Sequence, residues 1–269
     1  MVTEGGRLVD VESVLQSNPQ IKWVQLPSAG IERYRRVIAR YPEVAWTSAK
    51  GAYARPVAEH ALALTLAALR GFKMAAAATS WRSHTGLSLH KKRCVVIGAG
   101  GIAAEIVRLY KVFDASVTVI RRRPEPLANA DTTVTFTSLD EALRDAEIVC
   151  LAAAVTPETE QLMGAHQFNL LSKQAVLVNI GRGKLVDTDA LVDALNAGKL
   201  FGAGLDVTDP EPLPKHHPLW NAENCLITPH IANTAAAGRP LLHARIIENH
   251  RRLRDGEALL GRVDIAQGY

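Results

Sequence analysis

Short apolar runs alternate along most of the chain with segments whose hydrophobic residues recur at helical spacing. The apolar runs are rich in Val, Ile and Leu, which predicts β-strands. We expect strands at residues 21–26, 44–46, 94–97, 117–120, 148–152, 175–179, 204–207 and 226–228. We expect helices at residues 9–16, 57–70, 139–144, 189–197 and 240–254, with two more ending near residues 40 and 112. Such alternation is typical of a layered α/β protein whose strands run parallel.

The composition is that of an ordinary globular protein. Of the 269 residues, 48% are hydrophobic and 22% are charged, which excludes a chain that is disordered throughout. The net charge of +4 is too diffuse to predict binding to nucleic acid. Cys94, Cys150 and Cys225 lack the spacing of a disulfide framework or a thiolate metal site, so we interpret them as small core residues. The adjacent His216 and His217 are interpreted as a surface loop, and no metal is expected.

Neither export nor membrane insertion is indicated. The first ten residues do not combine a basic start with an apolar run, so they are unlike a signal peptide. The longest apolar stretch, residues 57–69, contains Glu59 and His60 and is shorter than a bilayer span. We therefore expect a cytoplasmic protein.

A glycine-rich loop follows the strand predicted at residues 94–97. Gly98 permits a tight turn, Gly100 lets the backbone approach a pyrophosphate, and the small Ala103 allows close packing of helix and strand. Gly101 and Ile102 open the following helix, whose N-terminus offers N–H donors and positive potential. A plain turn is the alternative, but strand, loop and helix occur in the order that dinucleotide binding requires.

The end of the next strand bears on the choice of nucleotide. A carboxylate about twenty residues beyond the loop would accept the ribose hydroxyls of NAD. This chain has Arg121, Arg122 and Arg123 there instead, and guanidinium groups suit a 2′-phosphate. A solvated run of charges is the alternative. We favour NADP(H) over NAD(H) as the cofactor.

Three more segments each place a reactive side chain directly after a predicted strand. They contribute Arg182 in a Gly-Arg-Gly turn, Glu211 in Asp-Pro-Glu-Pro, and His230 in Thr-Pro-His. The carboxyl ends of parallel strands are where open α/β sheets bind ligands. Each residue alone is more often a surface or structural residue, but as an ordered set beside a nicotinamide they would suffice for carbonyl reduction.

With these motifs the sequence resembles the D-isomer-specific 2-hydroxyacid dehydrogenase family, which includes hydroxypyruvate and glyoxylate reductases and phosphoglycerate dehydrogenases. The resemblance extends from about residue 21 to the C-terminus. The matching segments are residues 57–60 (Val-Ala-Glu-His), 98–103, 156–159 (Thr-Pro-Glu-Thr), 178–187, 204–213 and 226–232.

The resemblance implies catalytic roles for three residues. Arg182 would bind the carboxylate and carbonyl oxygens of the substrate. His230 would protonate the carbonyl oxygen as hydride reaches the carbon, and would act as the base in the reverse reaction. Glu211 would pair with His230, fix its ring and favour its protonated form. The implied reaction is hydride transfer between NADP(H) and a small 2-oxo acid, giving a D-2-hydroxy acid.

The resemblance also implies residues that bind the cofactor and the substrate. Asp206 would face the nicotinamide carboxamide, and Thr156 and Ile180 would belong to the cofactor site, as would Gly98, Gly100, Gly101, Ile102, Arg121 and Arg122. Ala29 and Gly30 lie in a loop that resembles the family's substrate loop, where backbone N–H groups receive the substrate carboxylate.

The implied architecture has two α/β domains. Residues 73–237 would form a Rossmann-type doubly wound parallel sheet that binds the dinucleotide. Residues 1–72 and 238–269 would form a smaller, flavodoxin-like substrate domain. Family members usually begin with a further strand–helix unit that this chain lacks, so we expect this domain to be N-terminally shortened. The resemblance and the long apolar helix at residues 57–70 imply a homodimer.

Two alternatives remain open. One is an NAD-dependent dehydrogenase of the phosphoglycerate type, which cofactor preference would distinguish. The other is a non-catalytic nucleotide-sensing protein similar to the family's corepressors, which would bind nucleotide without turning over 2-oxo acids. The expected partner in all cases is a small molecule, with no nucleic acid and no membrane.

Overall fold

The computed structural model describes residues 10–81, 83 and 85–264, and the chain folds into two compact units. Unit 1 consists of Met1–Tyr53 together with Thr234–Tyr269, and unit 2 is the continuous segment Ala54–Asn233. The sequence predicted a continuous domain within a discontinuous one, with boundaries after residues 72 and 237. The units of the structure divide earlier in the chain at both places.

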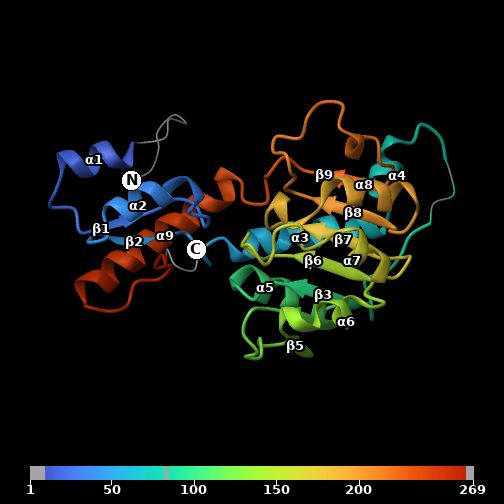
Figure 1. The fold of residues 1–269 in the computed structure, drawn as a ribbon, viewed down its shortest axis with the longest axis horizontal. Helices are drawn as coiled ribbons and strands as arrows, with labels where there is room; N and C mark the ends of the chain where they lie inside the picture. The colour runs from blue at the N-terminus through green and yellow to red at the C-terminus, as the bar shows by residue number, and fades with distance from the viewer. Residues whose placement is uncertain (1–9, 82, 84, 265–269) are drawn as a thin grey trace. The chain divides into compact units, whose positions relative to one another are not determined.

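Unit 2 is built on a seven-stranded sheet whose neighbouring strands are all parallel. Its strands are β3 (Arg93–Ile97), β4 (Ser116–Ile120), β5 (Thr132–Val134), β6 (Ile148–Leu151), β7 (Val176–Asn179), β8 (Gly202–Leu205) and β9 (Cys225–Ile227). Their spatial order is β5-β4-β3-β6-β7-β8-β9 (Figure 1). The chain therefore runs outward from β3 on one side and then returns to continue on the other. This is the doubly wound Rossmann arrangement, and the predicted fold class is confirmed.

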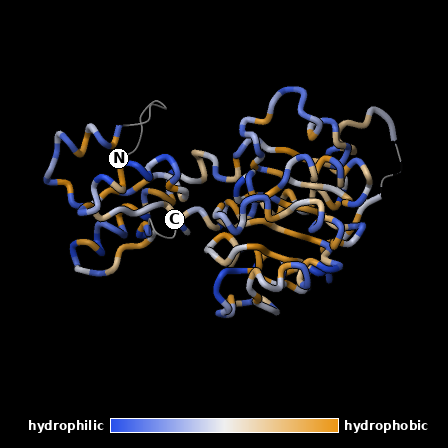
Figure 2. Tube along the Cα trace, viewed as in Figure 1, coloured by the Kyte–Doolittle hydropathy of each residue, from blue (hydrophilic) through white to orange (hydrophobic). Residues whose placement is uncertain are grey.

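Helices cover both faces of this sheet. On one face α3 (Ala54–Leu69) and α5 (Gly101–Lys111) lie against each other (Figure 1). On the other lie α6 (Leu139–Leu143), α7 (Ala165–Leu170) and α8 (Thr188–Asn196), whose apolar residues join one core with the strands. Figure 2 shows the hydrophobic residues concentrated in the strands between these layers. Burial on both faces explains why the central strands are nearly continuous apolar runs.

Small residues on β8 let α3 lie close to the sheet. A Cβ placed on Gly204 would lie only 2.8 Å from the Cβ of Leu64. Val57, Ala61 and Ala68 are also buried on this side of the helix. Because α3 contributes to the core of unit 2, the first boundary falls before this helix and not after it. Burial within the unit also accounts for much of the apolar length of α3, which the sequence analysis had linked to a partner copy.

Unit 1 contains a two-stranded parallel sheet, β1 (Trp23–Gln25) and β2 (Ala45–Thr47). Its helices are α1 (Val11–Ser17), α2 (Arg35–Arg40) and α9 (Ala235–Arg254). Leu15, Leu26, Ile31, Ile38, Val44 and Trp46 form its buried apolar core. A small parallel sheet with flanking helices is the α/β arrangement expected of the second domain.

The last helix begins earlier than predicted. The sequence analysis expected this helix at residues 240–254, where the hydrophobic residues recur at helical spacing. In the structure the Thr234 hydroxyl accepts a hydrogen bond from the backbone N–H of Ala237, and Pro240 lies inside the helix. The side-chain cap at Thr234 therefore marks the start of α9, and the second unit boundary falls just before it.

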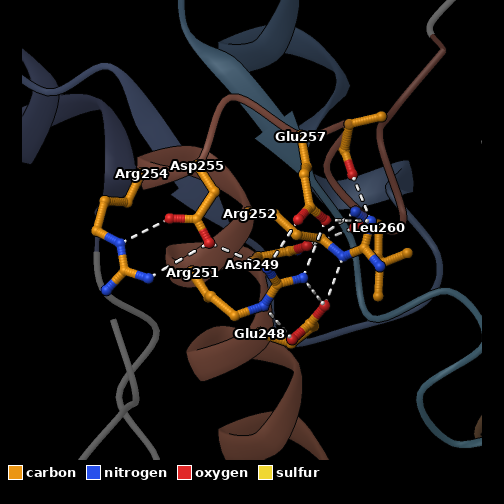
Figure 3. A network of polar contacts seen from close by, with 9 residues as sticks. Glu248, Asn249, Arg251, Arg252, Arg254, Asp255, Glu257 and Leu260 are labelled. Atoms are coloured by element: carbon orange, nitrogen blue, oxygen red, sulfur yellow. Dashed lines mark hydrogen bonds and ion pairs between the residues drawn. The ribbon is translucent and has the colours of Figure 1, made fainter.

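Charged residues crowd the last turns of α9 (Figure 3). The carboxylate of Glu248 accepts hydrogen bonds from Arg251 and Arg252 at distances between 2.7 and 3.1 Å. Arg251 also donates to Glu257, which lies just beyond the helix. Arginines near the carboxyl end of a helix interact favourably with its dipole. The network thus joins the end of α9 to the segment that follows it.

Apart from short 3-10 turns, the described elements that were not predicted are β5, α7 and α4 (Phe72–Ala77). Each has six residues or fewer, so too few apolar positions fall within it to establish a period. The backbone N–H of Arg121 donates to the carbonyl of Val134, which helps hold β5 at the edge of the sheet. Tertiary pairing, more than local propensity, defines this strand.

Candidate active site

Every residue of unit 2 that the sequence analysis assigned to chemistry lies just after a strand or at the start of the helix that follows it. Residues 98–102 follow β3, 121 and 122 follow β4, 156 follows β6, 180 and 182 follow β7, 206 and 211 follow β8, and 230 follows β9. The strands are parallel and in register, so these segments share one edge of the sheet. In a doubly wound sheet this edge is where ligands bind.

The turn after β3 fits a dinucleotide pyrophosphate. Gly98 has a φ of +118°, and a Cβ there would lie 2.5 Å from the carbonyl oxygen of Ala152. Gly100 caps α5, and a Cβ on it would meet nothing within 4 Å. Gly101 and Ile102 begin the helix. The space beside Gly100 and the N–H groups at the start of an 11-residue helix suit a phosphate oxygen.

The arginines directly follow β4, the strand that pairs with β3. The side chain of Arg121 is 24% exposed, and its Nη1 donates to the backbone carbonyl of Glu125 at 2.9 Å. The carboxylate of Glu125 lies 3.9 Å from Nη2 of Arg121. Arg122 and Arg123 are exposed. The local charge at the end of β4 is therefore positive, with one acidic side chain beside it.

The turn after β6 is closed by a threonine hydroxyl. Thr159 is 4% exposed, and its Oγ1 accepts a hydrogen bond from the backbone N–H of Thr156 at 2.8 Å. The same hydroxyl donates to the carbonyl of Ala154, also at 2.8 Å. These bonds fix the backbone around Thr156, which the sequence assigned to the cofactor site.

A buried asparagine shapes the turn that carries Arg182. Asn179, at the end of β7, is 1% exposed. Its Oδ1 accepts from the backbone N–H of Gly181 at 3.1 Å, and its Nδ2 donates to the carbonyl of Arg182 at 2.9 Å. Ile180 is buried, whereas Arg182 is partly exposed and bonds to the carbonyl of Gly181 through Nη1.

The Arg182 turn touches the loop that leads to Glu211. A Cβ on Gly183 would lie 1.9 Å from the backbone oxygen of Thr208, so only glycine permits this approach. The hydroxyl of Thr188 also donates to the carbonyl of Asp209 at 2.7 Å. Close backbone packing and one side-chain hydrogen bond therefore bring together the segments that follow β7 and β8.

Glu211 and His230 are in direct contact. Oε1 of Glu211 lies 2.7 Å from Nδ1 of His230, and both side chains are about half exposed. Because an ionised carboxylate can only accept, Nδ1 carries the proton and donates it to Glu211. The remaining ring nitrogen of His230, Nε2, is then the atom available for acid–base chemistry. His230 also has a φ of +55°, in the left-handed region that residues other than glycine rarely adopt.

Asp206 is only 2% exposed, and its carboxylate is surrounded by donors. It accepts hydrogen bonds from the hydroxyl of Thr228 at 2.7 Å and from the N–H groups of Ile231 and Ala232 at 2.9 and 3.0 Å. Nε2 of His60 lies 3.3 Å from it. Burial by itself would raise the pKa of Asp206, but these donors outweigh it and lower the pKa to about 2. Asp206 is therefore ionised at neutral pH.

Two residues of this cluster were missed in the sequence analysis. His60 was noted only as part of a matching segment, and Thr228 only as part of the Thr-Pro-His motif. Nε2 of His60 lies 2.9 Å from Oγ1 of Thr228, which joins α3 to the end of β9. A histidine within the apolar helix at residues 57–70 was the available signal, because a polar side chain that is largely removed from water requires a partner.

The predicted substrate loop lies in unit 1, directly after β1. The hydroxyl of Ser28 donates to the carbonyl of Gly30 at 2.6 Å, and the N–H of Ala49 donates to the carbonyl of Ser28 at 2.9 Å. Ala29 lies between these anchored residues and is partly exposed. The loop is thus held in a defined turn within its own unit.

Several other expectations concern residues outside this edge. Cys94, Cys150 and Cys225 are buried and free, and burial raises the pKa of Cys150 to about 12. Nδ1 of His217 accepts from the N–H of Leu219 and so caps a short helical turn. Within the described ranges, three or more His, Cys, Asp or Glu residues nowhere gather as they would around a metal ion. None of the described helices has the length and apolarity to cross a bilayer.

Sequence comparisons identify a family. Residues 62–232 match the family described as D-isomer specific 2-hydroxyacid dehydrogenase, NAD binding domain. An uncharacterized protein of Corynebacterium melassecola is 36% identical over 255 residues, which cover 93% of this chain and 84% of that protein. A human glyoxylate reductase/hydroxypyruvate reductase is 38% identical over 158 residues, covering 58% of this chain. The matched region spans only about half of the human enzyme's length, 48%.

Solved structures give the same result. A protein of Thermus thermophilus has a TM-score of 0.79 at 32% identity, with 94% of this chain and 82% of that chain covered. A D-isomer specific 2-hydroxyacid dehydrogenase from Xanthobacter autotrophicus, in complex with NADPH and MES, has a TM-score of 0.81 at 30% identity. That match covers 95% of this chain and 81% of the other.

Proposed function

We propose that this chain, which belongs to the D-isomer specific 2-hydroxyacid dehydrogenase family of oxidoreductases, transfers hydride between NADP(H) and a small 2-oxo acid to give a D-2-hydroxy acid. Glyoxylate and hydroxypyruvate are the proposed substrates, as in the names of its human and bacterial relatives. The observation that carries the proposal is the 2.7 Å contact between Glu211 and His230 on the sheet edge that also carries the glycine turn.

The cofactor site is assigned to residues that fit its charged groups. A nicotinamide cofactor, when bound, supplies the hydride. Gly98, Gly100, Gly101 and Ile102 would hold its pyrophosphate at the start of α5, where the backbone is open to approach. Thr156, in the turn after β6, and Ile180, directly after β7, are still predicted to bind the cofactor. Asp206 stays predicted to face the carboxamide.

His230 would move the proton. In the direction of reduction its Nε2 donates a proton to the carbonyl oxygen of the substrate, and in oxidation it removes the hydroxyl proton. The carboxylate of Glu211 holds Nδ1–H and stabilises the positive charge of the protonated ring. The half exposure of both side chains lets a small substrate reach the ring.

Arg182 would bind the substrate as an anion. Its guanidinium is permanently charged and presents parallel donors, which suits the carboxylate and carbonyl oxygens of a 2-oxo acid. Asn179 fixes the turn that carries it. Ala29 and Gly30 stay predicted to bind the substrate carboxylate through their N–H groups.

Preference for NADP(H) is proposed from the arginines after β4. Arg121 and Arg122 give a positive charge at the strand end where an acidic residue would select NAD. The Xanthobacter relative was solved with NADPH, which supports the same choice. A homodimer and a cytoplasmic location also stay predictions, and light scattering on the purified protein tests the first.

A substrate and cofactor panel tests the proposal. Oxidation of NADPH and NADH is followed with glyoxylate, hydroxypyruvate and larger 2-oxo acids, and kcat/KM is compared. We expect turnover of the two short acids, with kcat/KM higher for NADPH than for NADH. The Arg121→Ala and Arg122→Ala variants should each raise KM for NADPH more than KM for NADH, since they remove a charge–phosphate interaction.

Two outcomes contradict the proposal. A higher kcat/KM with NADH would overturn the cofactor assignment and favour an NAD-dependent dehydrogenase. Tight binding of nucleotide without turnover of any 2-oxo acid would overturn the reaction itself and favour a nucleotide sensor.

A further inference from the structure

We propose that Asp206, Thr228 and His60 form a clamp that holds His230 in the backbone conformation from which its imidazole meets Glu211. The three would be positioning residues of the reaction, acting through His230 and not on the substrate. The assignment rests on the proposed function, in which His230 is the proton donor.

The backbone at His230 needs to be held. Its φ of +55° puts the backbone of this residue in the left-handed region. That conformation costs free energy for a residue with a Cβ. The N–H of His230 points back to the carbonyls of Asp206 and Thr228, at 2.9 and 3.0 Å. Such a conformation persists only where the surrounding structure stabilises it.

The Asp206 carboxylate accepts hydrogen bonds from residues before and after His230. Before the histidine, Oδ1 accepts from the Thr228 hydroxyl at 2.7 Å. After it, Oδ1 accepts from the N–H of Ile231 at 2.9 Å and Oδ2 accepts from the N–H of Ala232 at 3.0 Å. A buried carboxylate with this many donors forms strong, charge-assisted hydrogen bonds. The residues on either side of His230 are thereby tied to one rigid point at the end of β8.

His60 connects the clamp to α3. Its Nε2 lies 2.9 Å from Oγ1 of Thr228 and 3.3 Å from Oδ1 of Asp206. Because the Thr228 hydroxyl proton is donated to Asp206, its oxygen accepts from His60, so Nε2 of His60 carries a proton. The side chain of His60 is only 20% exposed, and the helix that carries it packs on β8 and β9. The helix layer thus supports the turn through the side chain of His60.

Weakening these contacts should have different effects on kcat and on stability, depending on whether the three residues position His230 or only stabilise the fold. Weakening a structural cluster lowers stability and leaves the turnover of each folded molecule unchanged. Weakening the clamp lets the His230 turn relax, which lowers kcat while the glycine turn after β3 still binds NADPH. The contact between Nδ1 of His230 and Glu211 should loosen at the same time.

The test compares Thr228→Val, which removes only the hydroxyl, with Thr228→Ser, which keeps it. His60→Phe and His60→Gln form a second pair, since Gln retains a donor near the position of Nε2. Thr65→Val is the matched control, because Thr65 is a fully buried threonine of α3 whose hydroxyl bonds to Tyr110 instead. Each variant is measured for kcat per NADPH-binding site, for the Kd of NADPH, and by NMR for the Nδ1 proton of His230.

We expect Thr228→Val and His60→Phe to lower kcat by about tenfold with the Kd for NADPH within about twofold of the wild type. The Nδ1 proton resonance, assigned by its loss in His230→Ala, should broaden or shift in these two variants. Thr228→Ser and His60→Gln should restore both readouts, and Thr65→Val should change neither.

The clamp is overturned if Thr228→Val and His60→Phe keep the wild-type kcat and the wild-type His230 resonance, or if Thr65→Val changes both readouts as much as they do. If the wild-type protein turns over no 2-oxo acid, the proposed function fails while the NMR comparison still decides whether the clamp holds His230.

Discussion

Two carboxylates of this protein, one in each unit, have a pKa that is lowered to about 2, and the causes of the lowering differ. Asp206 is buried, and its pKa is lowered by His60, Thr228 and two backbone N–H groups against the effect of burial. Glu248 is partly exposed on α9, and bonds from Arg251 are the largest cause of its low pKa (Figure 3). Similar pKa values therefore arise from a buried site and from a surface network.

The difference between the two sites lies in what each carboxylate holds. Asp206 fixes backbone groups beside His230, for which chemistry is proposed, so its loss leaves part-buried and buried donors without an acceptor. Glu248 holds long side chains that remain in contact with water, where an ion pair contributes little and is screened by salt. A lowered pKa therefore shows how much a carboxylate contributes to stability only together with its burial and the groups that it binds.

The largest effect on these two sites is expected from Asp206→Ala. This change leaves the Thr228 hydroxyl, the N–H group of Ile231 and the buried N–H group of Ala232 without their acceptor. We expect the free energy of unfolding to fall by roughly 3 kcal/mol, together with a loss of kcat. Urea denaturation measures the first. A free energy equal to that of the wild type would show that these donors find water instead.

A smaller effect is expected from acid. The pKa of Asp206 in the folded state, about 2, is below its ordinary value near 4, so its ionisation stabilises the fold above about pH 4. This stabilisation, about 2 kcal/mol in all, is lost as the pH falls from about 4 toward 2. Denaturation at a series of pH values down to about 3 should show a flatter curve for Asp206→Asn than for the wild type. Parallel curves would contradict a lowered pKa at Asp206.

The smallest effect is expected at the surface. Glu248→Gln removes a carboxylate that bonds to Arg251 and Arg252. We expect the Tm to fall by only about 1–3 °C at low salt, and the difference should shrink in about 1 M NaCl because salt screens exposed charges. Differential scanning calorimetry at both salt concentrations checks this. A fall in Tm as large as that of Asp206→Ala, measured in the same calorimeter under the same conditions, would contradict the distinction between the buried and the surface site.

Much of the fold could be predicted because its central strands are apolar runs separated by turns. The strand at residues 94–97 differs from β3 by one residue at its start, and the strand at 117–120 differs from β4 in the same way. The boundary expected after residue 72 differs from that of the structure because the sequence does not show which sheet α3 packs against. Gly204 is the residue that admits the helix, and its meaning appears only when Leu64 is seen beside it.

In the candidate site, the meeting of Glu211 and His230 could be predicted from the sequence, but the bonds around them could not. Glu211 and His230 could be placed on one edge because parallel strands end there, and they lie in contact. The bonds of Asp206 could not be predicted, because the chain separates it from His60 by about 150 residues and no local pattern joins them. The left-handed backbone of His230 was equally hidden, since that conformation is set by tertiary hydrogen bonds.

The most direct test of the account is the turnover of His230→Ala with NADPH and a short 2-oxo acid, measured beside its affinity for NADPH. We expect kcat to fall roughly a thousandfold while the Kd for NADPH stays within about twofold of the wild type, because the proton donor is lost and the glycine turn is unchanged. A variant that turns over at the wild-type rate would contradict the role of His230 and, with it, the account of the site.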